Sequence, residues 1–245
     1  MQKSTVYSSM NNCIFASTST IYGSTYLEYL SEQLLELFQY TDEVLFIPYA
    51  RPSGISHDQY LEIAAKPFQK MGKRLIGIHS FENKTEAVQN AKGIFTGGGN
   101  SFVLVSALYE QKIITPLQTA ITSGTPYLGT SAGSNIAGPS IKTSNDMPIV
   151  YPPSFDTLGI IPFNINPHYL DPDPNSKHKG ETRETRIKEF HKFNDIPVIG
   201  LREGSWISVK GNKCDLKGIG LSARIFEKDK PPYEIEENSS LDFLK

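Results

Sequence analysis

Residues 129–133 read Gly-Thr-Ser-Ala-Gly, a G-x-S-x-G pattern that follows a short apolar run at 126–128. This pattern places a serine on a sharp turn between a strand and a helix, and its neighbours are small because the turn is tight and strained. The Ser131 hydroxyl would then stand clear of the sheet, where backbone N–H groups of the helix N-terminus stabilise developing negative charge. The pattern therefore requires a strand-turn-helix unit and makes Ser131 a candidate nucleophile.

A second glycine cluster lies upstream, where residues 96–100 read Thr-Gly-Gly-Gly-Asn after an apolar run at 93–95. A serine on such a turn needs a second backbone N–H, from another loop, to bind the oxyanion of the reaction. We expect the glycine cluster to supply it. A serine hydrolase is the class of enzyme that the two clusters together favour.

Short apolar runs alternate with segments of helical periodicity, which favours βα units and a parallel sheet. We expect an α/β fold, a flavodoxin-like or amidotransferase-like, mostly parallel sheet flanked by helices. Segments 206–209 and 224–226 should form an antiparallel edge near the C-terminus. Other expected strands are 13–16, 44–47, 75–78, 93–95 and 197–201; expected helices are 27–38, 101–109, 182–193, one from about Asp58 and one opening at Pro116.

No repeat or linker divides the 245 residues, so we expect a single α/β domain over 1–245 with a loosely attached tail after about residue 231. The proline-rich region 146–173 should be irregular, with functional side chains held by the scaffold around it.

The formal net charge is −2, with neither sign concentrated, which argues against nucleic acid or a membrane surface as partner. Residues 1–12 lack a signal-peptide core, and no apolar run is long enough to span a bilayer. The two cysteines, Cys13 and Cys214, indicate neither a disulfide framework nor a cysteine-based zinc site. We expect a cytoplasmic enzyme.

A serine nucleophile needs a base, and histidine suits this because its pKa lies near the working pH. His168 stands out among five histidines because Pro167 restricts the backbone just before it. The alternative interpretation of His168 is a loop histidine whose ring forms hydrogen bonds with backbone groups. The remaining four, in polar or helical contexts typical of surface histidines, are His57, His79, His178 and His191.

A carboxylate should orient the imidazole. Glu203 directly follows an expected buried strand, at the end where α/β active sites assemble. Asp146 lies in the irregular region between Ser131 and His168, where it could equally form a turn or anchor a loop or substrate. The sequence alone does not decide which of these two carboxylates orients the imidazole. With Glu203 the chain order is Ser, His, Glu, which differs from the Ser, acid, His order of α/β-hydrolases.

A family resemblance covers most of the chain, from about Val44 to Ser208. The chain resembles the dipeptidase E, or α-aspartyl dipeptidase, family in the segments 97–100, 129–133, 143–150, 165–168, 179–183 and 200–206. The resemblance implies a cytoplasmic serine exopeptidase that cleaves dipeptides with an N-terminal aspartate, and that uses no metal or other cofactor.

The resemblance also implies roles for single residues. Ser131 would be the nucleophile and His168 the base. Glu203 would be the relay acid, although Asp146 occupies a position to which the same role has been assigned in the family. The oxyanion-hole N–H groups would come from Gly99 and Ala132. Arg183, otherwise an ordinary surface helix arginine, would bind the substrate aspartate, because its planar guanidinium matches a carboxylate. Acceptors for the substrate amino group would be Asn100 or Glu181.

Three alternatives compete with this interpretation. A cyanophycinase-like enzyme would share the serine turn and fold but cut β-linked aspartyl-arginine units. A class-I amidotransferase would need a cysteine at the turn, and neither cysteine is placed there. The third is a non-catalytic ligand-binding relative, against which the serine, histidine and both acids argue. A small peptide is the expected partner, and we expect a monomer or a weak homo-oligomer.

Overall fold

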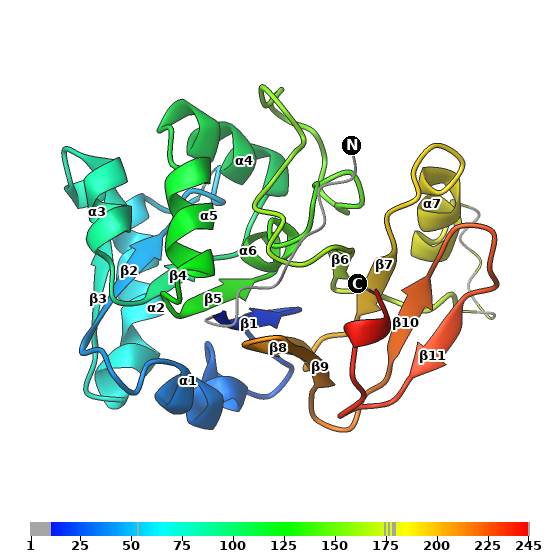
Figure 1. Cartoon of the computed structure of the whole chain (residues 1–245), viewed down its shortest axis with the longest axis horizontal. Coiled ribbons are helices and arrows are strands. Elements are labelled where there is room, and N and C mark those ends of the chain that lie inside the picture. Colours follow the sequence, from blue (N-terminus) through cyan, green and yellow to red (C-terminus); the bar gives the residue numbers. More distant parts are fainter. Residues whose placement is uncertain (1–10, 53, 174, 176, 178–179, 245) are drawn as a thin grey trace.

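A computed structural model describes residues 11–52, 54–173, 175, 177 and 180–244. The expectations for the first ten residues and for His178 and Lys179 lie outside these residues. Two sheets organise the chain, a large one with helices on both sides and a smaller one beside its antiparallel edge (Figure 1). In the described ranges, no helix combines the length and apolar character that crossing a bilayer requires.

The larger sheet has seven strands. In spatial order they are β3 (Arg74–Gly77), β2 (Glu43–Ile47), β4 (Ile94–Thr96), β5 (Tyr127–Thr130), β1 (Asn12–Ala16), β8 (Trp206–Lys210) and β9 (Lys213–Lys217). The first five run parallel, whereas β8 pairs antiparallel with β1 and with β9. The expected α/β fold, mostly parallel with an antiparallel edge, is confirmed.

Alternate residues along each strand point into two different apolar layers, as the pleat of a strand requires. In β1, Cys13 and Phe15 belong to one core cluster, while Ile14 and Ala16 belong to the other. The first layer is covered by α3 (Lys84–Asn90), α4 (Ser101–Glu110) and α5 (Ile114–Thr122), and the second by α1 (Ser31–Leu37) and α2 (His57–Lys70). A sheet buried on both faces leaves its strand ends as the place for polar chemistry.

The smaller sheet has four strands, β11 (Tyr233–Ile235), β10 (Ala223–Phe226), β7 (Val198–Leu201) and β6 (Asn164–Pro167), at the right of Figure 1. Helix α7 (Arg183–Phe190) packs on one of its faces through Ile187 and Phe190. The expectation that 224–226 extends the antiparallel edge of the main sheet is wrong, because β10 pairs with β7 and β11 instead.

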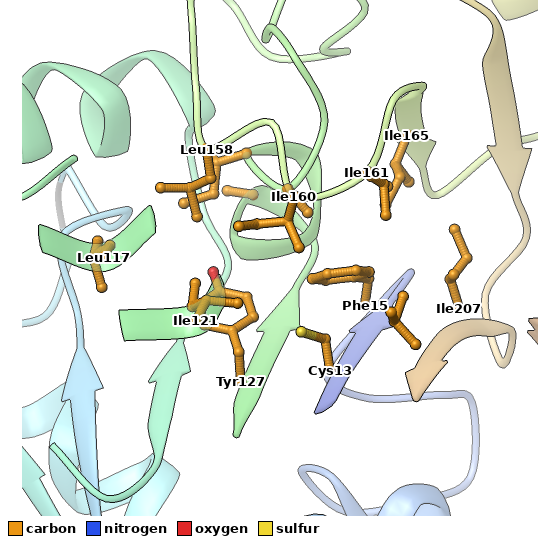
Figure 2. Packing of buried hydrophobic residues seen from close by; sticks show 14 of the residues in the cluster. Cys13, Phe15, Leu117, Ile121, Tyr127, Leu158, Ile160, Ile161, Ile165 and Ile207 are labelled. Carbon is orange, nitrogen blue, oxygen red and sulfur yellow. The ribbon is translucent and has the colours of Figure 1, made fainter. Parts of the chain in front are cut away.

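The irregular region contributes more to the core than its prolines indicate. Leu158, Ile160 and Ile161 are almost fully buried and lie over Phe15 and Tyr127 of the main sheet (Figure 2). The chain then enters β6, a strand that sequence reasoning missed, and β6 runs parallel to β7. Their carboxyl ends carry His168 and, two residues after Leu201, Glu203.

Several boundaries differ from expectation. The 27–38 helix is divided into a 3-10 turn, η1 (Glu28–Leu30), and α1, while α3 was not expected at all. Phe193, the last residue of the expected 182–193 helix, follows the end of α7 and is 91% exposed. The segment after residue 231 contributes β11 and η3 (Asp242–Leu244), and it buries Leu241.

Candidate active site

Ser131 lies between β5 and α6 (Ala132–Asn135), in the strand-turn-helix unit that the G-x-S-x-G pattern predicts. Its backbone has φ 52° and ψ −110°, a strained conformation for a residue with a side chain. The flanking glycines make the turn possible, because an added Cβ at Gly129 would lie 2.4 Å from the Gly133 oxygen, and one at Gly133 would lie 2.1 Å from the Thr96 oxygen. This part of the structure holds the Ser131 hydroxyl at the carboxyl edge of the sheet.

The His168 imidazole joins Ser131 to Glu203. Its Nε2 lies 2.9 Å from Oγ of Ser131, and its Nδ1 lies 2.6 Å from Oε1 of Glu203. With Nδ1 protonated and bound to the carboxylate, Nε2 is free to accept the serine proton, which is the geometry of a nucleophile, base and orienting acid. The Glu203 side chain is 51% exposed, so this acid stands at the rim of the site.

The tip of β1 holds all three of these residues in place. The Ser131 N–H donates to the Ala16 oxygen at 3.1 Å. Ser17, which is fully buried, accepts the His168 N–H at 2.8 Å and donates from Oγ to the Leu201 oxygen at 2.7 Å. One hydroxyl thus connects the ends of three strands, two of which belong to the smaller sheet.

Asp146 lies in the same cavity but binds other groups. Its Oδ2 accepts from the Ser101 N–H at 2.6 Å and from the Ser144 hydroxyl at 3.1 Å. These bonds anchor the 144–146 loop to the first turn of α4. Of the two candidate acids, the structure therefore brings Glu203 rather than Asp146 to His168.

Arg183 is half-buried at the start of α7, and its Nη1 donates to the carbonyl oxygens of Pro167 and His168. No carboxylate in the described part of the chain forms an ion pair with it. Burial lowers the pKa of Arg183, while the charges of Glu203 and Asp146 favour its protonated form. A cation that has no ion-pair partner among the described residues thus lines the same cavity as Ser131.

The cavity has a volume of about 450 Å³, and its lining brings most of the expected residues together. It is lined by Ser101, Ser131, Ala132, Ser144, Asn145, Asp146, Pro167, His168, Leu170, Arg183 and Glu203. This lining does not include Gly99, Asn100 or Glu181. Asn100 instead caps α4, with Oδ1 accepting from Val103 N and Nδ2 donating to the Met147 oxygen, and Glu181 is exposed.

The two expected oxyanion donors have compatible surroundings. Within the residues that the structure describes, neither the Gly99 N–H nor the Ala132 N–H donates to a protein acceptor. Gly99 has φ 146°, and a Cβ there would lie 2.1 Å from the Ala50 oxygen, so only glycine fits.

Sequence reasoning missed several residues of this region, among them Ser17, Asn145 and Leu170. Ser17 directly follows β1, so its position at a strand end offered a signal. Asn145 donates from Nδ2 to the Pro167 oxygen at 2.9 Å, which supports the backbone before His168. Leu170 is 64% exposed on the cavity rim and carried no signal that separates it from any other loop leucine.

Solved structures of similar fold support the architecture. A putative peptidase E protein from Listeria monocytogenes superposes with a TM-score of 0.64 at 21% identity, covering 86% of this chain and 99% of its own. A peptidase from an acI-B1 actinobacterium gives a TM-score of 0.66 at 17% identity, covering 95% of this chain and 96% of its own.

Sequence relatives are much closer. A probable alpha-aspartyl dipeptidase of Drosophila melanogaster is 43% identical over 239 residues, 96% of this chain and 98% of the relative. Peptidase E of Streptomyces coelicolor is 45% identical over 233 residues, 95% of this chain and 94% of the relative. The Peptidase family S51 model matches residues 13–217, a range that runs from β1 to β9 and includes Ser131, His168 and Glu203. The chain belongs to peptidase family S51.

Proposed function

We propose that this chain is a serine dipeptidase that hydrolyses dipeptides with an N-terminal aspartate through an acyl-enzyme. The observation that carries the proposal is the Ser131-His168-Glu203 chain of hydrogen bonds, with the Arg183 cation lining the same cavity. The name of the Drosophila relative, probable alpha-aspartyl dipeptidase, supports the same substrate class, and the name of the Streptomyces relative, Peptidase E, supports a peptidase. A volume of about 450 Å³ suits a ligand of dipeptide size.

In the acylation step, Nε2 of His168 takes the proton of Ser131 as Oγ attacks the carbonyl carbon of the aspartyl residue. The resulting oxyanion accepts hydrogen bonds from the N–H groups of Gly99 and Ala132. Glu203 holds Nδ1–H and stabilises the imidazolium. His168 then donates the proton to the leaving amino group, and in deacylation it activates a water that hydrolyses the ester.

Two charged groups of the cavity would account for the proposed preference for dipeptides with an N-terminal aspartate. Arg183 would bind the β-carboxylate of the substrate, since no described carboxylate of the chain forms an ion pair with it. Asp146 would bind the substrate ammonium group, because in the described part of the chain its two hydrogen-bond donors both use Oδ2 and leave Oδ1 available. This replaces the expected acceptors Asn100 and Glu181, which do not line the cavity.

We further propose a cytoplasmic location and a monomer or weak homo-oligomer that needs no metal or other cofactor. The buried thiol of Cys13 supports a reducing compartment. Fractionation, sedimentation and activity in the presence of a chelator test these three statements.

The test is hydrolysis of Asp-Leu, Glu-Leu, Ala-Leu, N-acetyl-Asp-Leu and β-Asp-Arg by the wild-type chain and by Ser131→Ala. We expect the wild type to prefer Asp-Leu and the folded variant to be inactive. Preference for β-Asp-Arg would support a cyanophycinase-like activity. Turnover of Asp-Leu by Ser131→Ala at a near-normal rate would remove Ser131 from the mechanism.

A further inference from the structure

The peptide unit between Gly98 and Gly99 passes directly beside the nucleophile. A Cβ added to Gly98 would lie 2.9 Å from Cβ of Ser131 and 3.5 Å from its Oγ. Gly98 therefore has to be glycine for this backbone to approach the serine so closely. The approach brings the peptide unit that carries the Gly99 N–H, one of the two expected oxyanion donors, close to Ser131.

The carbonyl of this same peptide unit is held from the opposite side by Tyr60. The Tyr60 hydroxyl, from α2, donates to the Gly98 oxygen at 3.1 Å, in a buried contact. The peptide bond is trans, so its C=O and N–H point in opposite directions. A hydrogen bond that fixes the Gly98 carbonyl therefore also fixes the direction of the Gly99 N–H, and it polarises that N–H as a donor.

Tyr60 is itself rigidly held. Its side chain is only 1% exposed, and its ring meets that of Phe46 edge-on at 5.1 Å between centroids. The Arg51 guanidinium lies over the ring at 4.9 Å, and the Tyr26 hydroxyl is 3.4 Å from the Tyr60 hydroxyl. A donor anchored on three sides keeps one geometry during the reaction.

The preceding glycine provides the space for this contact. A Cβ at Gly97 would lie 2.4 Å from the Tyr60 hydroxyl oxygen. Each glycine of the cluster is thus required by a different close contact. A side chain would meet the Tyr60 hydroxyl at Gly97, Ser131 at Gly98 and the Ala50 carbonyl at Gly99.

We propose that Tyr60 is a positioning residue for the oxyanion hole, acting through the Gly98 carbonyl on the Gly99 N–H. It touches neither the substrate nor Ser131, and its effect appears where negative charge develops. The proposal rests on the proposed serine mechanism. Its consequence is that the tyrosine hydroxyl matters for the transition state and not for binding of the ground state.

The experiment compares Tyr60→Phe with Tyr109→Phe. The Tyr109 hydroxyl also donates to a backbone carbonyl, that of Asp156, at 3.1 Å, and neither residue lines the cavity, so both variants lose the same kind of bond. The readouts are kcat and KM for Asp-Leu, and inhibition by the aldehyde of aspartate and by free aspartate. The aldehyde forms a tetrahedral adduct with Ser131, whereas aspartate is a ground-state ligand.

For Tyr60→Phe we expect kcat to fall about tenfold, less than the ~10²–10³ of a lost oxyanion donor, with KM unchanged. Affinity for the aldehyde should fall by a similar factor and affinity for aspartate should not. Tyr109→Phe should match the wild type in all four readouts. A kcat for Tyr60→Phe equal to that of Tyr109→Phe, or equal losses of aldehyde and aspartate affinity, would overturn the proposal.

Gly97→Ala gives a second route, because its methyl group displaces the Tyr60 hydroxyl while the tyrosine remains. We expect the same loss of kcat, not additive with Tyr60→Phe, and additive losses would contradict the coupling.

If the wild type fails to cleave Asp-Leu, the proposed function fails. Tyr60 is then tested on p-nitrophenyl acetate, whose acylation of Ser131 uses the same hole without the aspartate site.

Discussion

Arg183 donates from Nη1 to the backbone carbonyl oxygen of His168, and the same nitrogen donates to the Pro167 oxygen at 3.1 Å. His168 has φ 53°, in the left-handed region, so its backbone needs such support. One guanidinium thus lines the cavity and also holds the residue that carries the base. The substrate recognition proposed for Arg183 would therefore be coupled to the position of His168.

Replacing Arg183 with alanine should affect both. We expect kcat/KM for Asp-Leu to fall by a factor that corresponds to a loss of about 2–5 kcal/mol of transition-state stabilisation, because a half-buried cation that pairs with the substrate carboxylate is lost. We also expect hydrolysis of p-nitrophenyl acetate, which carries no aspartate, to slow by about tenfold as His168 loses its tether. Steady-state kinetics on both substrates measure the two effects separately.

Arg186→Ala is the matched control, since Arg186 lies one turn further along α7 and is exposed. It should leave both rates unchanged. An Arg183→Ala enzyme that still prefers Asp-Leu over Ala-Leu by the wild-type factor would rule out the carboxylate contact.

Ser17→Ala should lower both stability and turnover. The change leaves the partly buried His168 N–H without its acceptor, which costs about 1–3 kcal/mol of unfolding free energy. Because the same hydroxyl also binds the Leu201 carbonyl, His168 and Glu203 should lose their alignment, and kcat should fall by about tenfold or more. Denaturant unfolding and kinetics on Asp-Leu measure the two losses.

Thr41→Val controls for the stability loss alone. The buried Thr41 hydroxyl also donates one bond and accepts one, both with Glu43, at the start of β2 and away from the cavity. A kcat for Ser17→Ala equal to that of Thr41→Val would show that Ser17 acts only on stability.

The Ser131 turn was predictable because a strained backbone with close neighbours admits few residue types, and the two glycines record that constraint in the sequence. The second sheet was not, because strands of four residues such as β6 resemble ordinary loop segments when prolines surround them. Glu203 was a candidate because it follows a buried strand. Ser17 and Tyr60 act through hydrogen bonds to backbone atoms of distant residues, and no local pattern reports such partners.

Glu203→Gln and Asp146→Asn should separate the two acids. The amide at 203 cannot hold the imidazole in the productive tautomer, so we expect kcat to fall by about 10²- to 10³-fold. This is less than for a buried acid, because water reaches the half-exposed Glu203. Asp146→Asn should chiefly raise KM, since the amide keeps the loop bonds in part but loses the charge that attracts the substrate ammonium. Kinetics on Asp-Leu decide between them, and a larger loss of kcat in Asp146→Asn would reverse the assignment.

Acid should weaken the smaller sheet through Glu234. Partial burial raises the pKa of this carboxyl, but hydrogen bonds from Arg202, Ser222 and Arg224 outweigh that effect and lower it from 4.5 to about 2. A carboxyl with a lower pKa in the folded state stabilises the protein above its unfolded pKa, and this contribution disappears as the pH falls from about 4.5 to about 2. Glu234→Gln should cost about 1 kcal/mol at pH 7, a value discounted for the water that reaches the carboxylate. Urea unfolding of both proteins should show this difference shrinking below pH 4.5. A difference that stays constant down to pH 2 would contradict the ionic origin.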